Sequence, residues 1–98
     1  MLNNKKVLIF AENYYEDLEL WYPKLRLIEE GVKVIVAGTG EKAYKGKNGY
    51  PIEVDGLIKD YKAKDFDAVI VPGGFAPDKL RRYEEVLDFV REMHSQNK

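Results

Sequence analysis

The sequence contains no cysteine and a single histidine, His94. The 98 residues therefore hold no disulfide, no thiolate metal site and no cysteine nucleophile, and one imidazole excludes a histidine-rich metal site. Long apolar runs are also missing. The run at residues 7–10 follows a polar start and is too short for a signal peptide or a membrane span. We therefore expect a cytoplasmic protein.

An excess of either charge is missing as well. The 16 Lys and Arg residues nearly balance the 17 Asp and Glu residues, for a formal net charge of -1. Without a basic excess to neutralise phosphates, neither nucleic acid nor a membrane surface is an expected partner. The hydrophobic fraction of 45% is ordinary for a globular chain, and no repeat or linker interrupts it. We expect one domain over residues 1–98.

Short apolar runs alternate with helical spacing. Continuous apolar runs are typical of strands buried in a parallel sheet, and apolar residues three or four apart are typical of a helix. The patterns predict strands at 7–11, 32–37 and 68–71, a glycine-rich loop or hairpin at 38–49, a short edge strand at 50–55, a short helix or loop at 59–67, a first helix from about 18 that ends at Gly31, and a last helix over 77–95.

Each predicted helix has an apolar face. In the first helix this face consists of Leu18, Trp21, Leu25 and Ile28. In the last it consists of Leu80, Tyr83, Leu87, Val90 and His94, joined by Val86 and Met93.

The order of elements predicts a doubly wound α/β fold with a mostly parallel sheet and an inserted hairpin. In a flavodoxin-like order the first strand lies between the second and the third, and ligands bind where the strand order reverses. Residues 12–17 and 72–78 should meet there. The last helix has no strand after it, and the strand at 68–71 would expose an apolar edge. We therefore expect the native protein to continue past Lys98, or a second chain to supply the next strand.

Two segments carry candidate catalytic groups. The Gly73-Gly74 pair ends a buried strand, so its amides are candidates for an oxyanion hole, although a plain turn explains it equally well. Glu16 starts the first helix and is a candidate for orienting or protonating a reacting group, although acids favour a first helical turn anyway. Asp78 is either a helix cap or a residue that reaches a neighbouring site.

Cofactor sites are disfavoured. Gly38-Thr39-Gly40 resembles part of a dinucleotide fingerprint but follows the second strand, and the first strand is followed by a loop without glycine. No phosphate-binding P-loop is present. We expect no cofactor and no metal, and no catalytic role for His94, because no nucleophile accompanies it.

The chain resembles the PfpI/ThiJ family, which includes intracellular cysteine proteases and related deglycase and glyoxalase-like enzymes of the class I glutamine-amidotransferase-like superfamily. The resemblance covers nearly the whole chain and rests on three segments: KVLIFAENYYEDLELWYPKLRLIEEG, GKNGYPIEVD and FDAVIVPGGFAPDKLRR. The pairing of EDLELWYP with PGGFAPDKLR is the specific part. The resemblance implies a flavodoxin-like fold.

The resemblance also implies roles for individual residues. Glu16 matches the family's acid that hydrogen-bonds the nucleophilic cysteine, and Gly74, with Gly73 beside it, matches the backbone oxyanion donor. Asp78 matches an acidic position that reaches the cysteine-histidine pair of an adjacent subunit, where the family often has the longer Glu. Phe75 stands where some relatives have Arg.

The ending departs from the family pattern. The family places an Ala-x-Cys-His-Gly elbow just after the helix that ends here at residues 96–98. The resemblance therefore implies the N-terminal part of a PfpI-type cysteine hydrolase, a peptidase or a protein or nucleotide deglycase, inactive alone. The alternative is a non-catalytic, flavodoxin-like binding module. In either case we expect self-association into a dimer or larger homo-oligomer, or pairing with a second chain that carries the missing half.

Overall fold

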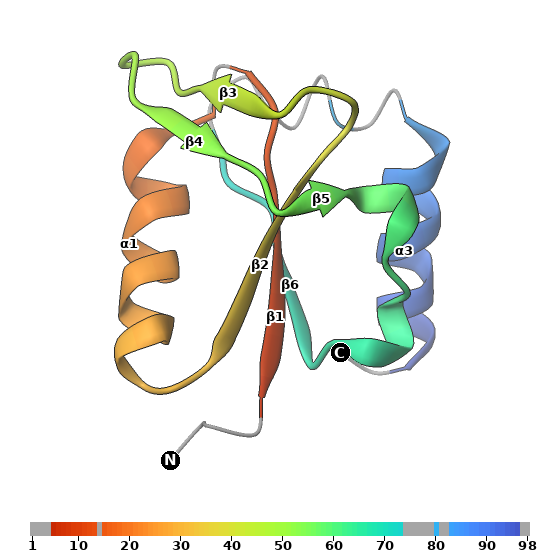
Figure 1. Ribbon diagram of the computed structural model, residues 1–98. Coiled ribbons are helices and arrows are strands. Elements are labelled where there is room, and N and C mark those ends of the chain that lie inside the picture. Colours follow the sequence, from red (N-terminus) through yellow and green to blue (C-terminus); the bar gives the residue numbers. More distant parts are fainter. Residues whose placement is uncertain (1–4, 14, 74–79, 81–82, 97–98) are drawn as a thin grey trace.

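The computed structural model describes residues 5–13, 15–73, 80 and 83–96. They form three layers, with helix α1 on one face of a central sheet and α3 on the other (Figure 1). The elements are β1 Lys6–Phe10, α1 Asp17–Glu29, β2 Lys33–Gly38, β3 Ala43–Lys45, β4 Pro51–Glu53, β5 Gly56–Leu57, the 3-10 turns η1 Ile58–Asp60 and η2 Ala63–Asp65, β6 Ala68–Ile70 and α3 Glu84–Ser95.

The central sheet is parallel in the order β5-β2-β1-β6. β1 lies between the second and third predicted strands, which confirms the flavodoxin-like order. Leu8 pairs with Ile35 of β2 and with Val69 of β6, and it is fully buried. The two-residue strand β5 was not predicted, because so short a segment carries no periodic pattern.

Helix α1 ends where the sequence predicts. Gly31 adopts a φ of 83°, a left-handed conformation that glycine adopts without strain. Its N–H donates to the carbonyl of Ile28 at 3.0 Å, and the N–H of Val32 donates to Leu27 at 3.0 Å. This pair of bonds is a Schellman motif, which satisfies the last helical carbonyls and turns the chain into β2.

The apolar face predicted for α1 is not its buried face. Leu18 is 73% exposed, and Leu25 and Ile28 are about half exposed. The fully buried helix residue is instead Leu20, and Asp17 is buried beside the hairpin formed by β3 and β4. Spacing shows which residues share a face but not which face meets the sheet, and here the hydrogen bonds of Asp17 turn the other face inward.

The last helix also differs from its prediction. A continuous helix over 77–95 is wrong, because Tyr83 is extended (φ -108°, ψ 126°) and α3 starts after it at Glu84. The predicted apolar face is confirmed in part, because Leu80, Val86 and Met93 are buried. It is wrong for Tyr83, Val90 and His94, which are exposed. Phe89, which the prediction left out, is the third buried residue of α3.

Phe89 joins α3 to the sheet. Its ring lies 5.8 Å from the ring of Phe10 in β1 and 5.8 Å from that of Phe66, both in edge-to-face contact. Such contacts add to the energy of burial. In the described part of the chain, no helix is long and apolar enough to cross a membrane.

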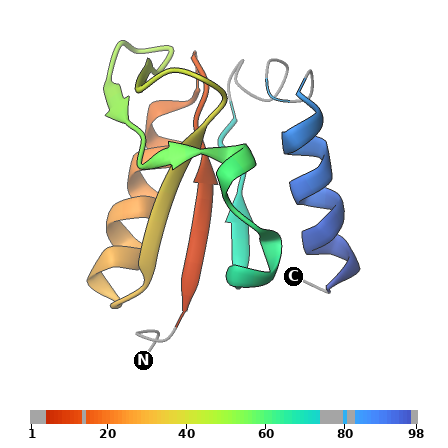
Figure 2. The ribbon, with the colours of Figure 1, turned by 45° about the vertical axis from the view of Figure 1, so that its right-hand side comes forward.

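The antiparallel hairpin β3–β4 stands apart from the main sheet, above the start of α1 (Figures 1 and 2). Pro51 is the first residue of β4, a position where its missing N–H costs no ladder bond. The turn of this hairpin, residues 46–50, lies against the start of α1, where Lys47 pairs with Glu16.

Candidate functional site

The two segments expected to meet do so. The backbone N–H of Glu16 donates to the carbonyl of Gly73 at 2.9 Å. Residue 16 lies just before α1, beyond the carboxyl end of β1, and residue 73 lies beyond the carboxyl end of β6. Since β1 and β6 are parallel neighbours, this bond fixes the helix start against the glycine turn at the point where the strand order reverses.

Four carboxylates lie in or just before the first turn of α1, and each has different hydrogen-bond or ion-pair partners: Glu12, Glu16, Asp17 and Glu19. Glu12 is 6% exposed and accepts hydrogen bonds from the hydroxyl of Thr39 at 2.6 Å and from the N–H of Asn13 at 2.9 Å. A buried carboxylate with two such donors is stably placed. Glu12 therefore ties the loop after β1 to the loop after β2.

Asp17 organises the hairpin turn. Its carboxylate is 5% exposed and accepts the backbone N–H of Asn48 and that of Tyr50, each at 3.0 Å. Gly46 lies against the same carboxylate, where an added Cβ would come within 2.3 Å of an Asp17 oxygen. The turn can therefore close on Asp17 only because residue 46 has no side chain.

Glu19 holds the glycine turn. One of its carboxylate oxygens accepts the N–H of Gly73 at 2.6 Å. The Gly73 amide, one of the two predicted oxyanion donors, is thus already bonded to an anion. Gly74 and Asp78, the other predicted site residues on this turn, lie outside the described residues.

Glu16 is placed differently from the other three acids. One of its oxygens pairs with the Lys47 ammonium at 2.7 Å, and its side chain keeps 21% of its surface exposed. Among the described residues, Lys47 is the one partner of this carboxylate. The Glu16 carboxylate raises the pKa of the Lys47 ammonium above its usual value, with smaller contributions from Glu19 and Asp17.

The Tyr15 side chain also holds the hairpin turn at residues 46–50. Its hydroxyl donates to the carbonyl of Tyr50 at 2.8 Å and accepts the indole N–H of Trp21 at 3.1 Å. Burial raises the pKa of the Tyr15 phenol, and the hydrogen bond from Trp21 partly offsets this. Tyr15, Glu16 and Asp17 therefore each contact the turn at 46–50, through three different kinds of bond.

The Gly38-Thr39-Gly40 loop is filled by a side chain of its own hairpin. The Tyr44 hydroxyl accepts the backbone N–H groups of Thr39, Gly40 and Glu41 at 2.9 to 3.0 Å. A Cβ on Gly38 would lie 2.5 Å from the Tyr44 ring. The backbone amides of this loop, whose sequence resembles part of a nucleotide-binding fingerprint, therefore donate to the Tyr44 hydroxyl oxygen.

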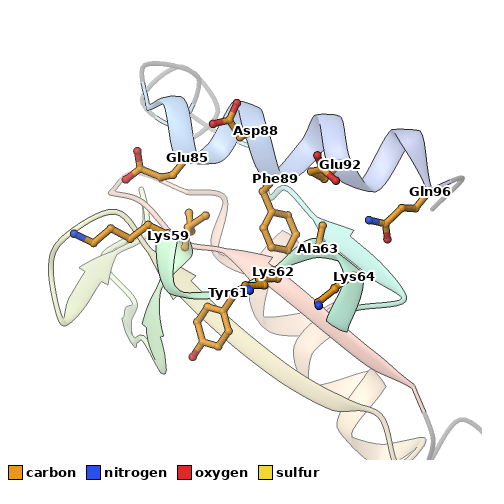
Figure 3. Close-up of a pocket in the computed structure, with 11 residues that line it drawn as sticks. Lys59, Tyr61, Lys62, Ala63, Lys64, Glu85, Asp88, Phe89, Glu92 and Gln96 are labelled. Carbon is orange, nitrogen blue, oxygen red and sulfur yellow. The ribbon is translucent and has the colours of Figure 1, made fainter.

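A separate groove of about 490 Å³ lies between the 3-10 turns and α3 (Figure 3). Phe89 points from α3 toward the 3-10 segment, and Asp88 points away from it (Figure 3). Lys59, Lys62 and Lys64 line one side, and the two predicted catalytic residues that the structure describes, Glu16 and Gly73, lie outside the groove. Among the described residues, no group of three or more His, Asp or Glu side chains is placed to hold a metal ion.

Sequence reasoning missed Lys47, Glu19 and the structural role of Asp17. Lys47 lies in a glycine- and lysine-rich stretch, and nothing in the sequence distinguishes it from Lys42 or Lys45. Its partner is 31 positions away, and the contact exists only after the hairpin folds back over α1.

The fold and the site together define a flavodoxin-like α/β domain with a carboxylate and a glycine turn joined at the switch point. The sequence pattern of the DJ-1/PfpI family matches residues 5–98, and the chain belongs to this family. The recognised resemblance to PfpI and ThiJ proteins is thereby confirmed.

Several relatives place the chain within the family. It is 38% identical over 93 residues to the deglycase PfpI of Pyrococcus furiosus, covering 95% of this chain and 56% of that protein. It is 41% identical over 87 residues to an uncharacterised protein of Archaeoglobus fulgidus, covering 89% of this chain and 52% of the relative. The chain thus spans about half the length of the curated relatives that it matches.

Solved structures of DJ-1/ThiJ/PfpI proteins have the same fold as this chain. A two-domain protein of Anabaena variabilis, with DJ-1/ThiJ/PfpI-like and ferritin-like domains, superposes with a TM-score of 0.92 at 42% identity, over 96% of this chain and 28% of that one. The DJ-1beta protein of Drosophila melanogaster superposes with a TM-score of 0.86 at 29% identity, over 98% and 52% of the two chains.

Proposed function

We propose that this chain supplies the acid and amide half of a PfpI-type catalytic centre that acts on carbonyl groups, with deglycation as its reaction. The cysteine nucleophile and its histidine would come from a segment outside these 98 residues. The observation that supports the proposal is the hydrogen bond from the backbone N–H of Glu16 to the carbonyl of Gly73 at 2.9 Å, which holds the segment that carries the acid beside the glycine turn. The deglycase name of relatives such as PfpI favours deglycation over peptide hydrolysis.

In this reaction a cysteine sulfur adds to a substrate carbonyl carbon as the carbon–oxygen π bond breaks. The thiol proton passes to Glu16, and backbone amides of the glycine turn stabilise the oxyanion. Because the Gly73 amide is bonded to Glu19, the Gly74 amide is the donor that we assign to the oxyanion. Asp78 remains assigned to the cysteine-histidine pair of a neighbouring subunit.

A chimaeric protein tests this proposal. Residues 1–98 are fused to the part of Pyrococcus furiosus PfpI that follows the matched region, and release of free N-acetylarginine from its methylglyoxal adduct is measured. The chimaera should turn over the adduct, and the isolated chain should not. Glu16→Gln should reduce kcat by about 10² to 10⁴, the usual contribution of a positioned acid or base.

Glu53→Gln is the matched control, because it removes the charge of an exposed glutamate in β4, away from the start of α1. A chimaera that folds, as judged by circular dichroism, but remains inactive would overturn the proposal. So would equal rates for the Glu16 and Glu53 variants. Cleavage of a peptide substrate without activity on the adduct would replace deglycation by peptidase chemistry.

A second candidate function is a non-catalytic interaction module, favoured by the exposed apolar row on α1. Leu18 and Tyr22 are 73% and 69% exposed, and Leu25 and Ile28 continue the row along the helix. We propose that a second copy of the chain packs here, since contiguous exposed apolar side chains mark association surfaces. Sedimentation velocity should show a dimer that Leu25→Glu dissociates and the exposed control Lys33→Glu does not. A monomer at all concentrations would contradict it.

A further inference from the structure

The start of α1 places three carboxylates within one turn, and two of them are committed to backbone. Asp17 accepts the amides of Asn48 and Tyr50, and Glu19 accepts the amide of Gly73. Among the described residues, the Glu16 side chain accepts no backbone amide, and its partner is the Lys47 ammonium, at 2.7 Å.

The turn that carries Lys47 is anchored close to its charge. The N–H of Lys47 donates to the carbonyl of Tyr15 at 2.8 Å, one residue before Glu16. Within the turn, the N–H of Gly46 donates to Tyr50 and that of Gly49 donates to Gly46, each at 2.9 Å. The ammonium is therefore delivered by a fixed backbone, which reduces the entropy that an exposed ion pair usually costs.

We propose that Lys47 is a positioning residue of the Glu16 site, which holds the Glu16 side chain in one orientation for the reaction. The proposal rests on the proposed function, because it assigns a positioning residue to the acid of that site. Its own content is the pairing and its effect on Glu16.

The charges around the pair favour the contact. The Glu16 carboxylate raises the pKa of the Lys47 ammonium, and Glu19 and Asp17 raise it further. The ammonium therefore keeps its charge and its contact with Glu16. The contact involves one of the two Glu16 carboxylate oxygens.

The Lys47 titration on the 98-residue chain tests the pairing. The side-chain ¹³Cε and ¹⁵Nζ signals of Lys47 and Lys45 are followed by NMR as the pH rises. Lys45 is the control, because it lies in the same hairpin and its backbone N–H bonds Asn13. Lys47 should titrate at higher pH than Lys45, and Glu16→Gln should remove most of the difference while Glu53→Gln leaves it.

A second measurement tests the positioning of Glu16. Three-bond couplings of the Glu16 side chain should report one rotamer in the wild type and in Lys47→Arg, which keeps the charge. They should report averaged rotamers in Lys47→Met, and Lys45→Met should match the wild type. Coincident titration of Lys47 and Lys45, or an unchanged Glu16 rotamer in Lys47→Met, would overturn the proposal.

These outcomes are separate from those of the chimaera. An inactive chimaera would refute the proposed function and leave the NMR result standing as a statement about the ion pair. An active chimaera with averaged Glu16 rotamers in the wild type would refute the role of Lys47 alone.

Discussion

Replacing Asp17 by alanine should destabilise the protein more than any exposed acid would. The carboxylate accepts two backbone amides at 3.0 Å and is 5% exposed. A hydrogen bond to a charged group contributes about 1.5 to 3 kcal/mol. Asn48 and Tyr50 are themselves exposed, so water can reach their amides after truncation. We therefore take the lower part of the range for the two bonds together and expect a loss of about 3 to 4 kcal/mol.

This loss is large for a domain of 98 residues, whose total stability is roughly 5 to 15 kcal/mol. With a urea dependence of about 1 to 3 kcal/mol per molar, the unfolding midpoint should fall by about 1 to 4 M. Asp17→Asn keeps one acceptor oxygen and should lose about half as much. Asp65→Ala, an exposed acid outside the hairpin, is the control and should leave the midpoint near that of the wild type.

Two probes report the unfolding. Far-UV circular dichroism follows the helices, and the fluorescence of Trp21, the single tryptophan, follows the turn, because its ring lies 5.8 Å from that of Tyr50. In Asp17→Ala we also expect a red shift of the emission before global unfolding. If Asp17→Ala and Asp65→Ala unfold at the same midpoint, the assignment of Asp17 as the organiser of the turn is refuted.

Three further perturbations test the packing and the electrostatics. Gly46→Ala places a methyl group against the Asp17 carboxylate and should lower the free energy of unfolding by about 1 to 3 kcal/mol, the usual cost of overpacking. Gly40→Ala is the control, because the space around Gly40 is open and the added methyl group should cost little. Urea denaturation compares the two variants. Phe89→Ala should cost about 3 to 5 kcal/mol, because the ring is buried against two other rings, and a midpoint close to that of the wild type would contradict the core assigned to α3. The raised pKa of Tyr15 predicts that stability falls as the pH rises above 10.0, because the phenol then loses its proton in the unfolded state before it does so in the folded state. The thermal midpoint of the wild type should therefore decline at alkaline pH, and Tyr15→Phe should lose this part of the decline. An unchanged decline in Tyr15→Phe would assign it to other groups.

Much of the fold follows from the sequence. The continuous apolar runs of β1, β2 and β6 identify the parallel strands, because apolar side chains on both sides of a strand suit a sheet that is covered on both faces. The predicted burial holds for β1, in the middle of the sheet, whereas β6 at its edge is half-buried and Val71 is 47% exposed. Gly31 marks the end of α1, and Pro51 marks the start of β4, because each residue type restricts the backbone in a way that few positions require. These are local constraints, and local sequence carries them.

The errors are equally instructive. The apolar spacing of α1 is real, yet Leu18 and Leu25 face outward, because the side that packs is decided by Asp17 and the hairpin. In the last helix, the extended conformation of Tyr83 separates α3 from the residues before it. Periodicity describes an element in isolation, and these outcomes depend on what the element packs against.

The sequence by itself determined the family and the strand order. Only the tertiary structure decided which partner each acid has: Asp17 and Glu19 accept backbone amides, and Glu16 pairs with Lys47. The physical reason is the distance along the sequence between each acid and its partner. Strand and turn preferences arise within a few residues, whereas the partners of these carboxylates lie 31 to 54 positions away and meet them only when the hairpin and the glycine turn converge on α1.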